Sequence, residues 1–325
     1  MHANKESGFS LAELLIAMAI MLLISGAATT ALLKMTSTQA TIWNRTQMHS
    51  GIRGATEVLQ QEVGQAGRIA LPGKSVTLKN AVTAGSNPVT ITECPLSGSC
   101  TDSTAGMFIG ENLVIDAACA DTATPCGSVQ ETVTVTAISS TTITATFLYP
   151  HNAAAPVQVV GGFAAGVVPA ATTNGSSGTV LKLFGDINAD GNMVYVEYSC
   201  VIPPGGVGNL YRNMMAWDQA PPSASPTSSQ ILLSNITANP NGTPCFTYDT
   251  QTVNGTVYVT NVAITLTVQT QVIDPVTKRF QTETKALLNV APRNVFNVWE
   301  MATLNPTGYN PRIQATPASI ALLLP

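Results

Sequence analysis

The sequence predicts an α+β protein in which one long N-terminal helix precedes a mainly β, antiparallel globular head. Two observations predict this. An almost unbroken apolar run extends over residues 9–33, and helical spacing continues after it. From Ile69 onward the pattern changes to the two-residue period of half-buried strands rich in Thr and Val. We therefore expect a short polar leader at 1–8, a helix over 9–68 and a β-rich head over 69–325.

The helix has two expected halves. Residues 9–33 are long enough to span a bilayer. After Lys34 the chain becomes polar but keeps an apolar stripe at helical spacing. The stripe consists of Ile52, Ala55, Leu59, Val63 and Ala66. Because no proline precedes Pro72, nothing forces a break, and we expect one continuous helix from about Ser10 to Gly67 whose second half packs on the head.

The head is expected to be a set of antiparallel strands separated by Gly, Pro, Asn and Ser clusters. The candidate strands are 75–79, 89–92, 113–115, 131–137, 141–148, 157–160, 179–184, 193–201, 231–233, 257–271 and 280–290. Loops are expected at 85–88 and 221–229. The Ala-, Gly- and Thr-rich stretch 164–178 is expected to be a surface loop that subdivides the head. The strands 257–271 and 280–290 are expected to pair through a turn at Asp274-Pro275.

Composition and charge exclude some classes of function. Hydrophobic residues make up 45% and charged residues 10% of the 325 residues, a balance typical of a globular chain. The net charge is -4, and residues 69–325 alone hold nine Lys and Arg against fourteen Asp and Glu. No basic stripe is present, so the sequence does not support electrostatic binding of nucleic acid.

All six cysteines lie in the expected head, at Cys94, Cys100, Cys119, Cys126, Cys200 and Cys245. An even number confined to one region is typical of disulfides in an oxidising compartment. Local spacing favours the pairs Cys94–Cys100, Cys119–Cys126 and Cys200–Cys245. A zinc site is not favoured, because the sequence has no Cys-x-x-Cys and its three histidines are far from the cysteines.

One segment of the head fits the calcium-loop pattern D-x-[DN]-x-[DN]-G-x5-E. Its oxygen donors are Asp186, Asn188, Asp190, Asn192 and Glu197. Strand patterns flank this segment, whereas helices flank the loop of an EF-hand. The segment looks more like the calcium loops between β-strands in repeat adhesins and propellers, which usually have another carboxylate at the position of Val194. The alternative is a bare hairpin turn, since Asn, Asp and Gly favour the positive φ that such turns require. The sequence indicates no required cofactor. Whether this segment binds Ca2+ or is a bare hairpin turn stays open at this point.

An enzyme is not expected. Beyond the leader only His49 and His151 are present, the first expected on the helix surface and the second in a turn. The sequence contains no Gly-x-Ser-x-Gly, phosphate loop or His-Glu-x-x-His. Trp43, Trp217 and Trp299 are scattered and are expected as core or anchor residues.

The N-terminal residues carry the strongest functional signal. Gly8 ends the polar leader, Phe9 follows, and Glu13 stands at the start of the apolar run, where a carboxylate is costly in lipid. Ser10 and Glu13 also have the spacing of a helix capping box, which is the structural alternative for Glu13. A secretory signal peptide would place its small-residue cleavage site after the apolar run instead. An uncleaved membrane anchor is the plainer alternative.

This pattern resembles the type III signal of type IV pilins and type II secretion pseudopilins. The resemblance implies that a prepilin peptidase cuts between Gly8 and Phe9 and methylates the new N-terminus at Phe9. Glu13 then corresponds to the family's assembly glutamate. Major pilins often have a proline in the apolar half, which this chain lacks. Residues 282–294, which end in Val-Ala-Pro-Arg-Asn, look like the C-terminal region of PilW-like minor pilins.

The resemblance implies a minor pilin that primes, caps or joins a type IV pilus through its N-terminal helix. Its partners would be other pilins, the prepilin peptidase and the inner membrane, with a periplasmic head that later reaches the cell surface. A pseudopilin of the GspJ class is the first alternative, although pseudopilin heads are usually smaller. A pilus-tip adhesin or calcium-tuned binding module is the second.

Overall fold

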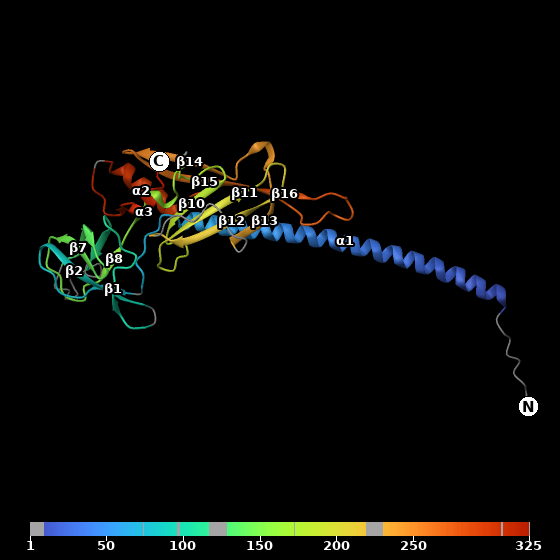
Figure 1. Cartoon of the computed structure of the whole chain (residues 1–325), viewed down its shortest axis with the longest axis horizontal. Coiled ribbons are helices and arrows are strands. Elements are labelled where there is room, and N and C mark those ends of the chain that lie inside the picture. The colour runs from blue at the N-terminus through green and yellow to red at the C-terminus, as the bar shows by residue number, and fades with distance from the viewer. Residues whose placement is uncertain are drawn as a thin grey trace, which may run out of the picture. The chain divides into compact units, whose positions relative to one another are not determined.

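The computed structural model describes residues 10–73, 75–95, 98–116, 129–171, 173–218, 230–306 and 308–324. The chain divides into two compact units. The anchor unit comprises Met1–Gly51 and Gln269–Glu283, and the head unit comprises Ile52–Val268 and Thr284–Pro325. The observed class is α+β, as predicted: a long N-terminal helix followed by a mainly antiparallel β head (Figure 1).

Helix α1 runs without interruption from Leu11 to Gln65 over 55 residues. The predicted continuous helix is therefore confirmed, as is its stripe, because Ile52, Ala55, Leu59, Val63 and Ala66 are all buried. The chain leaves the helix at Gly67, which has a φ of 82°. A Cβ there would lie 2.9 Å from the Val295 side chain and 3.0 Å from the Phe163 carbonyl oxygen, so only glycine fits this exit without strain.

Two small antiparallel sheets begin the head unit and share one apolar core. The first has the order β1-β2-β7-β6, with β3 paired to β2, and the second has the order β5-β4-β8. The strands are β1 (Ser75–Leu78), β2 (Gly85–Cys94), β3 (Thr101–Asp102), β4 (Asn112–Ile115), β5 (Glu131–Thr134), β6 (Ala137–Ile138), β7 (Thr142–Phe147) and β8 (Val157–Val159). Leu78, Ile91, Ile115, Ile143 and Phe147 lie in this core and are almost fully buried.

A seven-stranded antiparallel sheet forms the larger part of the head unit (Figure 1). Its order is β10-β11-β12-β13-β15-β14, and β16 also pairs with β15. The strands are β10 (Val180–Gly185), β11 (Val194–Val201), β12 (Gly208–Ala216), β13 (Ile231–Thr237), β14 (Phe246–Val253), β15 (Thr256–Gln269) and β16 (Thr282–Val290). The predicted pairing of the last two strands is thus confirmed.

The C-terminal segment packs back onto the head unit. Helix α2 (Arg293–Leu304) buries Val295, Val298 and Ala302. Strand β17 (Ile313–Gln314) pairs in parallel with β9 (Gly162–Phe163), and the short helix α3 (Ala318–Ala321) places Ile320 in an aromatic core with Phe163 and Phe184. The apolar end of the chain is therefore part of the head core.

Two expectations about the head are wrong. Residues 85–88 are not a loop, because Gly85 to Pro88 pair with β7 at the start of β2. The stretch 164–178 is not a surface loop over its first half. It begins with a 3-10 turn at Ala164–Gly166 and stays buried through Pro169. Gly166 lies so close to Gly67 that a side chain there would not fit. Strands β12 and β14 and helix α2 were not predicted.

Candidate functional site

Glu13 lies in the first turn of α1. The backbone N–H of Ser10 donates to Glu13 Oε2 at 2.9 Å, and the backbone N–H of Glu13 donates to Ser10 Oγ at 3.2 Å. These reciprocal bonds form a capping box, which satisfies two of the free N–H groups at the helix start. The predicted processing residues Gly8 and Phe9 lie outside the described residues. The geometry thus shows Glu13 in its local role and leaves its role between subunits to be tested.

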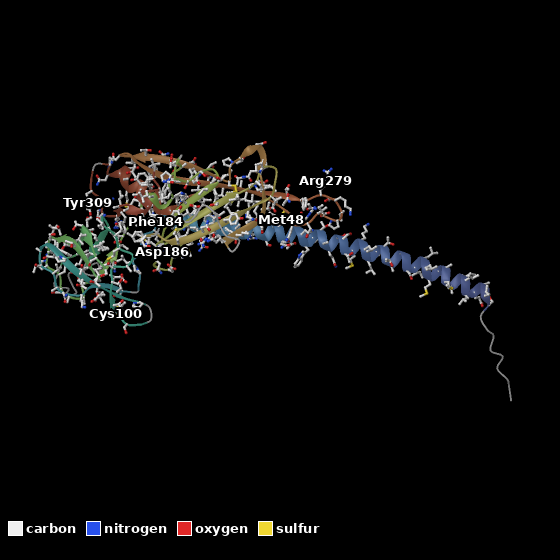
Figure 2. The ribbon with its side chains drawn as sticks, viewed as in Figure 1. Met48, Cys100, Phe184, Asp186, Arg279 and Tyr309 are labelled. Carbon is white, nitrogen blue, oxygen red and sulfur yellow. A yellow bond between two sulfur atoms is a disulfide. The ribbon has the colours of Figure 1, made fainter. Side chains whose placement is uncertain are left out.

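The apolar side chains that follow Glu13 are exposed. Every large hydrophobic residue from Leu11 to Ile24 is more than half accessible, and Figure 2 shows side chains standing out along this part of the ribbon. A continuous apolar surface of this extent needs a lipid or protein partner. By length and composition α1 is able to cross a membrane. This half of the helix therefore fits a membrane anchor.

At the other end of α1 a charged cluster ties the helix to the large sheet. Arg212 on β12 donates to Glu62 through Nη2 at 2.7 Å and Nε at 3.0 Å, and the Tyr198 hydroxyl on β11 donates to Glu62 at 2.6 Å. Burial raises the pKa of Tyr198, and the negative charge of Glu62 adds to this effect. This cluster was not predicted from the sequence. The position of Glu62 within the apolar stripe, between Leu59 and Val63, could have indicated a buried carboxylate with a partner.

The predicted calcium loop forms the turn between β10 and β11. Asp186 is fully buried, and its Oδ1 accepts the backbone N–H of Asp190 at 3.0 Å and of Gly191 at 3.3 Å. Its Oδ2 faces Arg68, whose Nε lies 3.3 Å away without forming a hydrogen bond. Asp190 Oδ1 accepts the N–H of Asn192, and Asn188 contacts Met214. Asp186, labelled in Figure 2, thus holds the turn with an oxygen that a cation would need.

Glu197, the last predicted ligand, lies on β11 opposite Lys182 of β10. It accepts the Tyr195 hydroxyl at 2.9 Å and the Ser199 hydroxyl at 3.3 Å, and the Lys182 ammonium is 3.8 Å away. Across the described ranges, no group of three or more His, Cys, Asp and Glu side chains converges as a metal site would require. Glu197 thus lies beside Lys182 on the paired strands rather than in the turn, and calcium binding by this loop stays a prediction.

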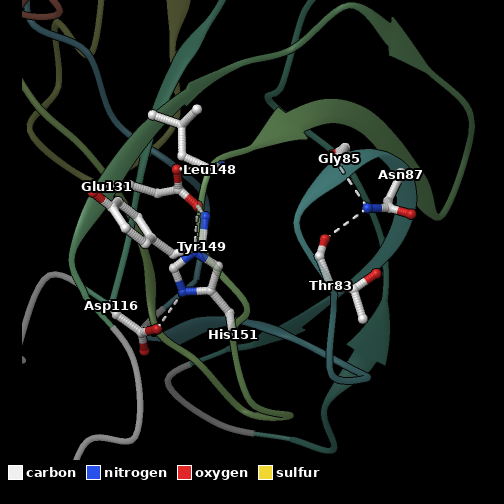
Figure 3. Close-up of polar contacts among 8 residues, drawn as sticks. All are labelled: Thr83, Gly85, Asn87, Asp116, Glu131, Leu148, Tyr149 and His151. Carbon is white, nitrogen blue, oxygen red and sulfur yellow. Dashed lines mark hydrogen bonds and ion pairs between the residues drawn. The ribbon is translucent and has the colours of Figure 1, made fainter.

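His151, expected in a turn, instead forms a β-bridge with Val82, and its side chain is buried, so this expectation is wrong. Its Nδ1 is 2.5 Å from Asp116 Oδ2 and its Nε2 is 2.5 Å from Glu131 Oε1 (Figure 3). Glu131 also accepts the backbone N–H groups of Leu148 and Tyr149. Both ring nitrogens of His151 are therefore in contact with carboxyl groups of the same chain.

The structure contains the disulfides Cys94–Cys100 and Cys200–Cys245. These are two of the three pairs that the spacing favours. The first closes a short loop after β2, and the second joins β11 to the residue before β14, across 45 positions. The predicted partners Cys119 and Cys126 lie outside the described residues. His49, expected on the helix surface, is exposed there and pairs with Glu283 within the anchor unit.

Comparison with known proteins gives one match. The family of the prokaryotic N-terminal methylation motif matches residues 3–29. This range contains Gly8, Phe9 and Glu13 together with most of the exposed apolar run. Neither a curated protein nor a solved structure matches the chain. The motif supports a prepilin-type signal, processing by a prepilin peptidase, and a pilin- or pseudopilin-type role in a type IV pilus or type II secretion.

Proposed function

We propose that this protein is a minor pilin, a low-copy subunit that primes, caps or joins a type IV pilus through its N-terminal helix. The methylation motif at residues 3–29 carries the proposal. The exposed apolar half of α1 and its continuous passage into the head unit support it. The length of the head, residues 69–325, favours a minor pilin over a secretion pseudopilin.

In this proposal the peptidase cuts after Gly8 and methylates the amine of Phe9. Glu13 of one subunit then pairs with the Phe9 amine of a neighbour. A carboxylate in lipid costs up to about 3 kcal/mol on the insertion scale, and an ion pair offsets this cost. The pairing therefore favours transfer of the helix from the membrane into the filament.

The capping box suggests two variants that separate the roles of Glu13. Glu13→Gln keeps an oxygen that accepts the Ser10 N–H but removes the charge. Ser10→Ala removes the hydroxyl that accepts the Glu13 N–H but keeps the carboxylate. If the charge acts between subunits, Glu13→Gln is processed normally yet absent from sheared filaments, while Ser10→Ala is incorporated.

Mass spectrometry of the N-terminal peptide in filament and membrane fractions measures both steps. Incorporation of Glu13→Gln at the wild-type level, with loss of Ser10→Ala, would assign Glu13 to capping alone. A wild-type peptide that begins at methylated Phe9 but occurs only in membranes would favour the pseudopilin alternative. An uncleaved peptide would contradict both.

A further inference from the structure

The hairpin that joins β15 to β16 within the anchor unit carries an unusual set of exposed side chains. Val272, Ile273, Val276 and Phe280 are between 46% and 60% accessible. Hairpin connections in water normally carry polar residues and glycine. Four exposed apolar residues in one short connection therefore indicate an apolar environment outside the chain.

Two of these residues, Val272 and Ile273, line a groove along α1. The groove has a volume of about 770 Å3, and its lining includes Thr36, Ile42, Trp43, Val272, Ile273 and Pro275. Trp43 is 71% accessible, so it is not a core residue. Figure 1 shows the hairpin running back beside α1 toward the apolar half of the helix. The groove is thus continuous with the surface expected to enter the membrane.

The hairpin is held in shape by its own hydrogen bonds. Asp274 Oδ1 accepts the backbone N–H groups of Val276 at 2.8 Å and Thr277 at 2.7 Å. The backbone N–H of Thr270 donates to the Gln281 carbonyl oxygen at 2.8 Å, and the Gln281 side chain is bound by Arg45. The apolar residues therefore stand on a fixed turn, and Asp274 points inward, where it is buried.

Charge is distributed unevenly between this region and the rest of the protein. Residues 34–51 and 269–283 contain four Lys and Arg against two Asp and Glu, whereas residues 52–268 and 284–325 contain nine against fourteen. The two carboxylates of the first set are committed, Asp274 to the turn and Glu283 to His49. Within the described part of the chain, no carboxylate lies in ion-pair range of Lys278 or Arg279.

The groove begins at the level expected for lipid headgroups. Thr36 follows Leu33, the end of the apolar run, by about 4.5 Å along the helix axis. The headgroup layer is about 5–8 Å thick on each side of the hydrocarbon core, so the Thr36 end of the groove lies in this layer, whereas Trp43, about 15 Å beyond Leu33, lies on its aqueous side. Basic side chains such as Lys278 and Arg279 favour this layer, because their apolar parts enter the acyl boundary while their charged ends stay in water.

We infer that the hairpin tip and the membrane-proximal end of the groove, at Thr36, form a docking surface for anionic phospholipid of the membrane that α1 crosses. The apolar side chains enter the acyl boundary, and Lys278 and Arg279 contact lipid phosphates. This inference rests on the proposed membrane-anchored state. Docking fixes the hairpin at the membrane surface until the subunit leaves for a filament.

The test uses full-length protein reconstituted in vesicles. Ile273→Trp is made in a Trp43→Phe background, and its emission is compared in vesicles with and without brominated acyl chains, which quench nearby indoles. Leu148→Trp in the same background is the matched control, because Leu148 is an exposed apolar residue of the head unit outside this surface. Trp217 and Trp299 give the same background in both. We expect loss of emission for Ile273→Trp only.

Adding Lys278→Gln and Arg279→Gln to the Ile273→Trp variant tests how much the two cations contribute to docking. Each cation near an anionic surface contributes about 1 kcal/mol, so both changes lower the docked-to-free ratio about thirty-fold in vesicles containing phosphatidylglycerol. In purely zwitterionic vesicles they have little effect. Vesicles that float with the protein while Ile273→Trp is quenched no more than Leu148→Trp would overturn the docking surface alone.

A photo-crosslinker at position 273 that joins two copies, without quenching, would assign the groove to a second subunit and also overturn the inference. Protein that does not float with vesicles at all would remove both the anchor and the docking surface.

Discussion

Helix α1 has two parts with the same secondary structure and opposite surroundings. The longer part, Leu11–Gly51, is called the first half below, and the shorter part, Ile52–Gln65, is called the second half. From Leu11 to Gly51 the helix belongs to the anchor unit, and its apolar side chains are largely exposed. From Ile52 to Gln65 it belongs to the head unit, and its stripe is buried against strands. The first half keeps its apolar surface for partners outside the chain, whereas the second half uses its apolar surface to hold the head.

This difference indicates which part of α1 contributes to the free energy of unfolding of the head. Burial of apolar side chains stabilises a fold only if the surface is removed from water within the folded chain. Changes in the second half should therefore alter unfolding of the head, and equal changes in the first half should alter only membrane insertion or assembly. Matched substitutions in the two halves test this directly.

The largest expected effect comes from a pair of leucines. Leu59 is 0% accessible and Leu22 is 72% accessible on the same helix. Leu59→Ala leaves a cavity and should lower the free energy of unfolding of the head by about 3 kcal/mol. Leu22→Ala leaves no cavity in the head and should leave this free energy unchanged. Denaturant unfolding of the full chain in detergent, followed by tryptophan fluorescence, measures both.

Equal destabilisation by the two leucine variants would show that the halves of α1 unfold as one cooperative unit. A small effect of Leu59→Ala would instead show that the head keeps its structure without the helix.

The contrast between the halves of α1 also shows what the sequence could predict. The helix and its buried stripe follow from periodicity, and most strands follow from alternation of apolar and polar residues. Helix α2 was not predicted, although Pro292 stands at its start and its buried residues Val295, Val298 and Ala302 have helical spacing. The buried positions of Glu62 and His151 depend on partners far away in sequence, such as Arg212 and Asp116, which no local pattern reveals.

A second prediction contrasts a buried carboxyl that has no cation with the paired Glu62. Glu111 is fully buried, accepts only the Phe108 N–H through its side chain, and has one carboxyl oxygen without a partner among the described residues. Burial raises its pKa to about 8 from 4.5. The folded state therefore keeps a proton that the unfolded state loses, so stability falls as the pH rises from about 4.5 to about 8.

Glu111→Gln keeps an acceptor for the Phe108 N–H and removes the ionisation. We expect it to abolish this loss of stability, which is on the order of a few kcal/mol across the window. The exposed Glu300 supplies the control variant, Glu300→Gln, which should leave the pH profile unchanged. Unfolding free energies at pH 5, 6, 7 and 8 measure the effect. A Glu111→Gln profile with the wild-type slope would contradict the assignment to Glu111.

The smallest expected effect comes from two glutamates of the second half that differ in burial and in their partners. Glu62 is bound by Arg212 and Tyr198 in the head, whereas Glu57 pairs with Arg53 on the exposed face of α1 at 2.8 Å. Glu62→Gln leaves a half-buried guanidinium without its counter-charge and should cost about 2 kcal/mol of head stability. Glu57→Gln should cost about 0.3 kcal/mol, since an exposed pair on a helix is screened by water.

The double variant Glu62→Gln with Arg212→Met distinguishes a structural tie from a charge effect. If the ion pair itself holds the helix on the sheet, the double variant stays destabilised. If the cost of the single variant comes mainly from the uncompensated cation, removing both charges restores most of the stability. The second outcome would mean that the apolar stripe alone joins α1 to the head, and that the cluster instead fixes the register in which the helix docks.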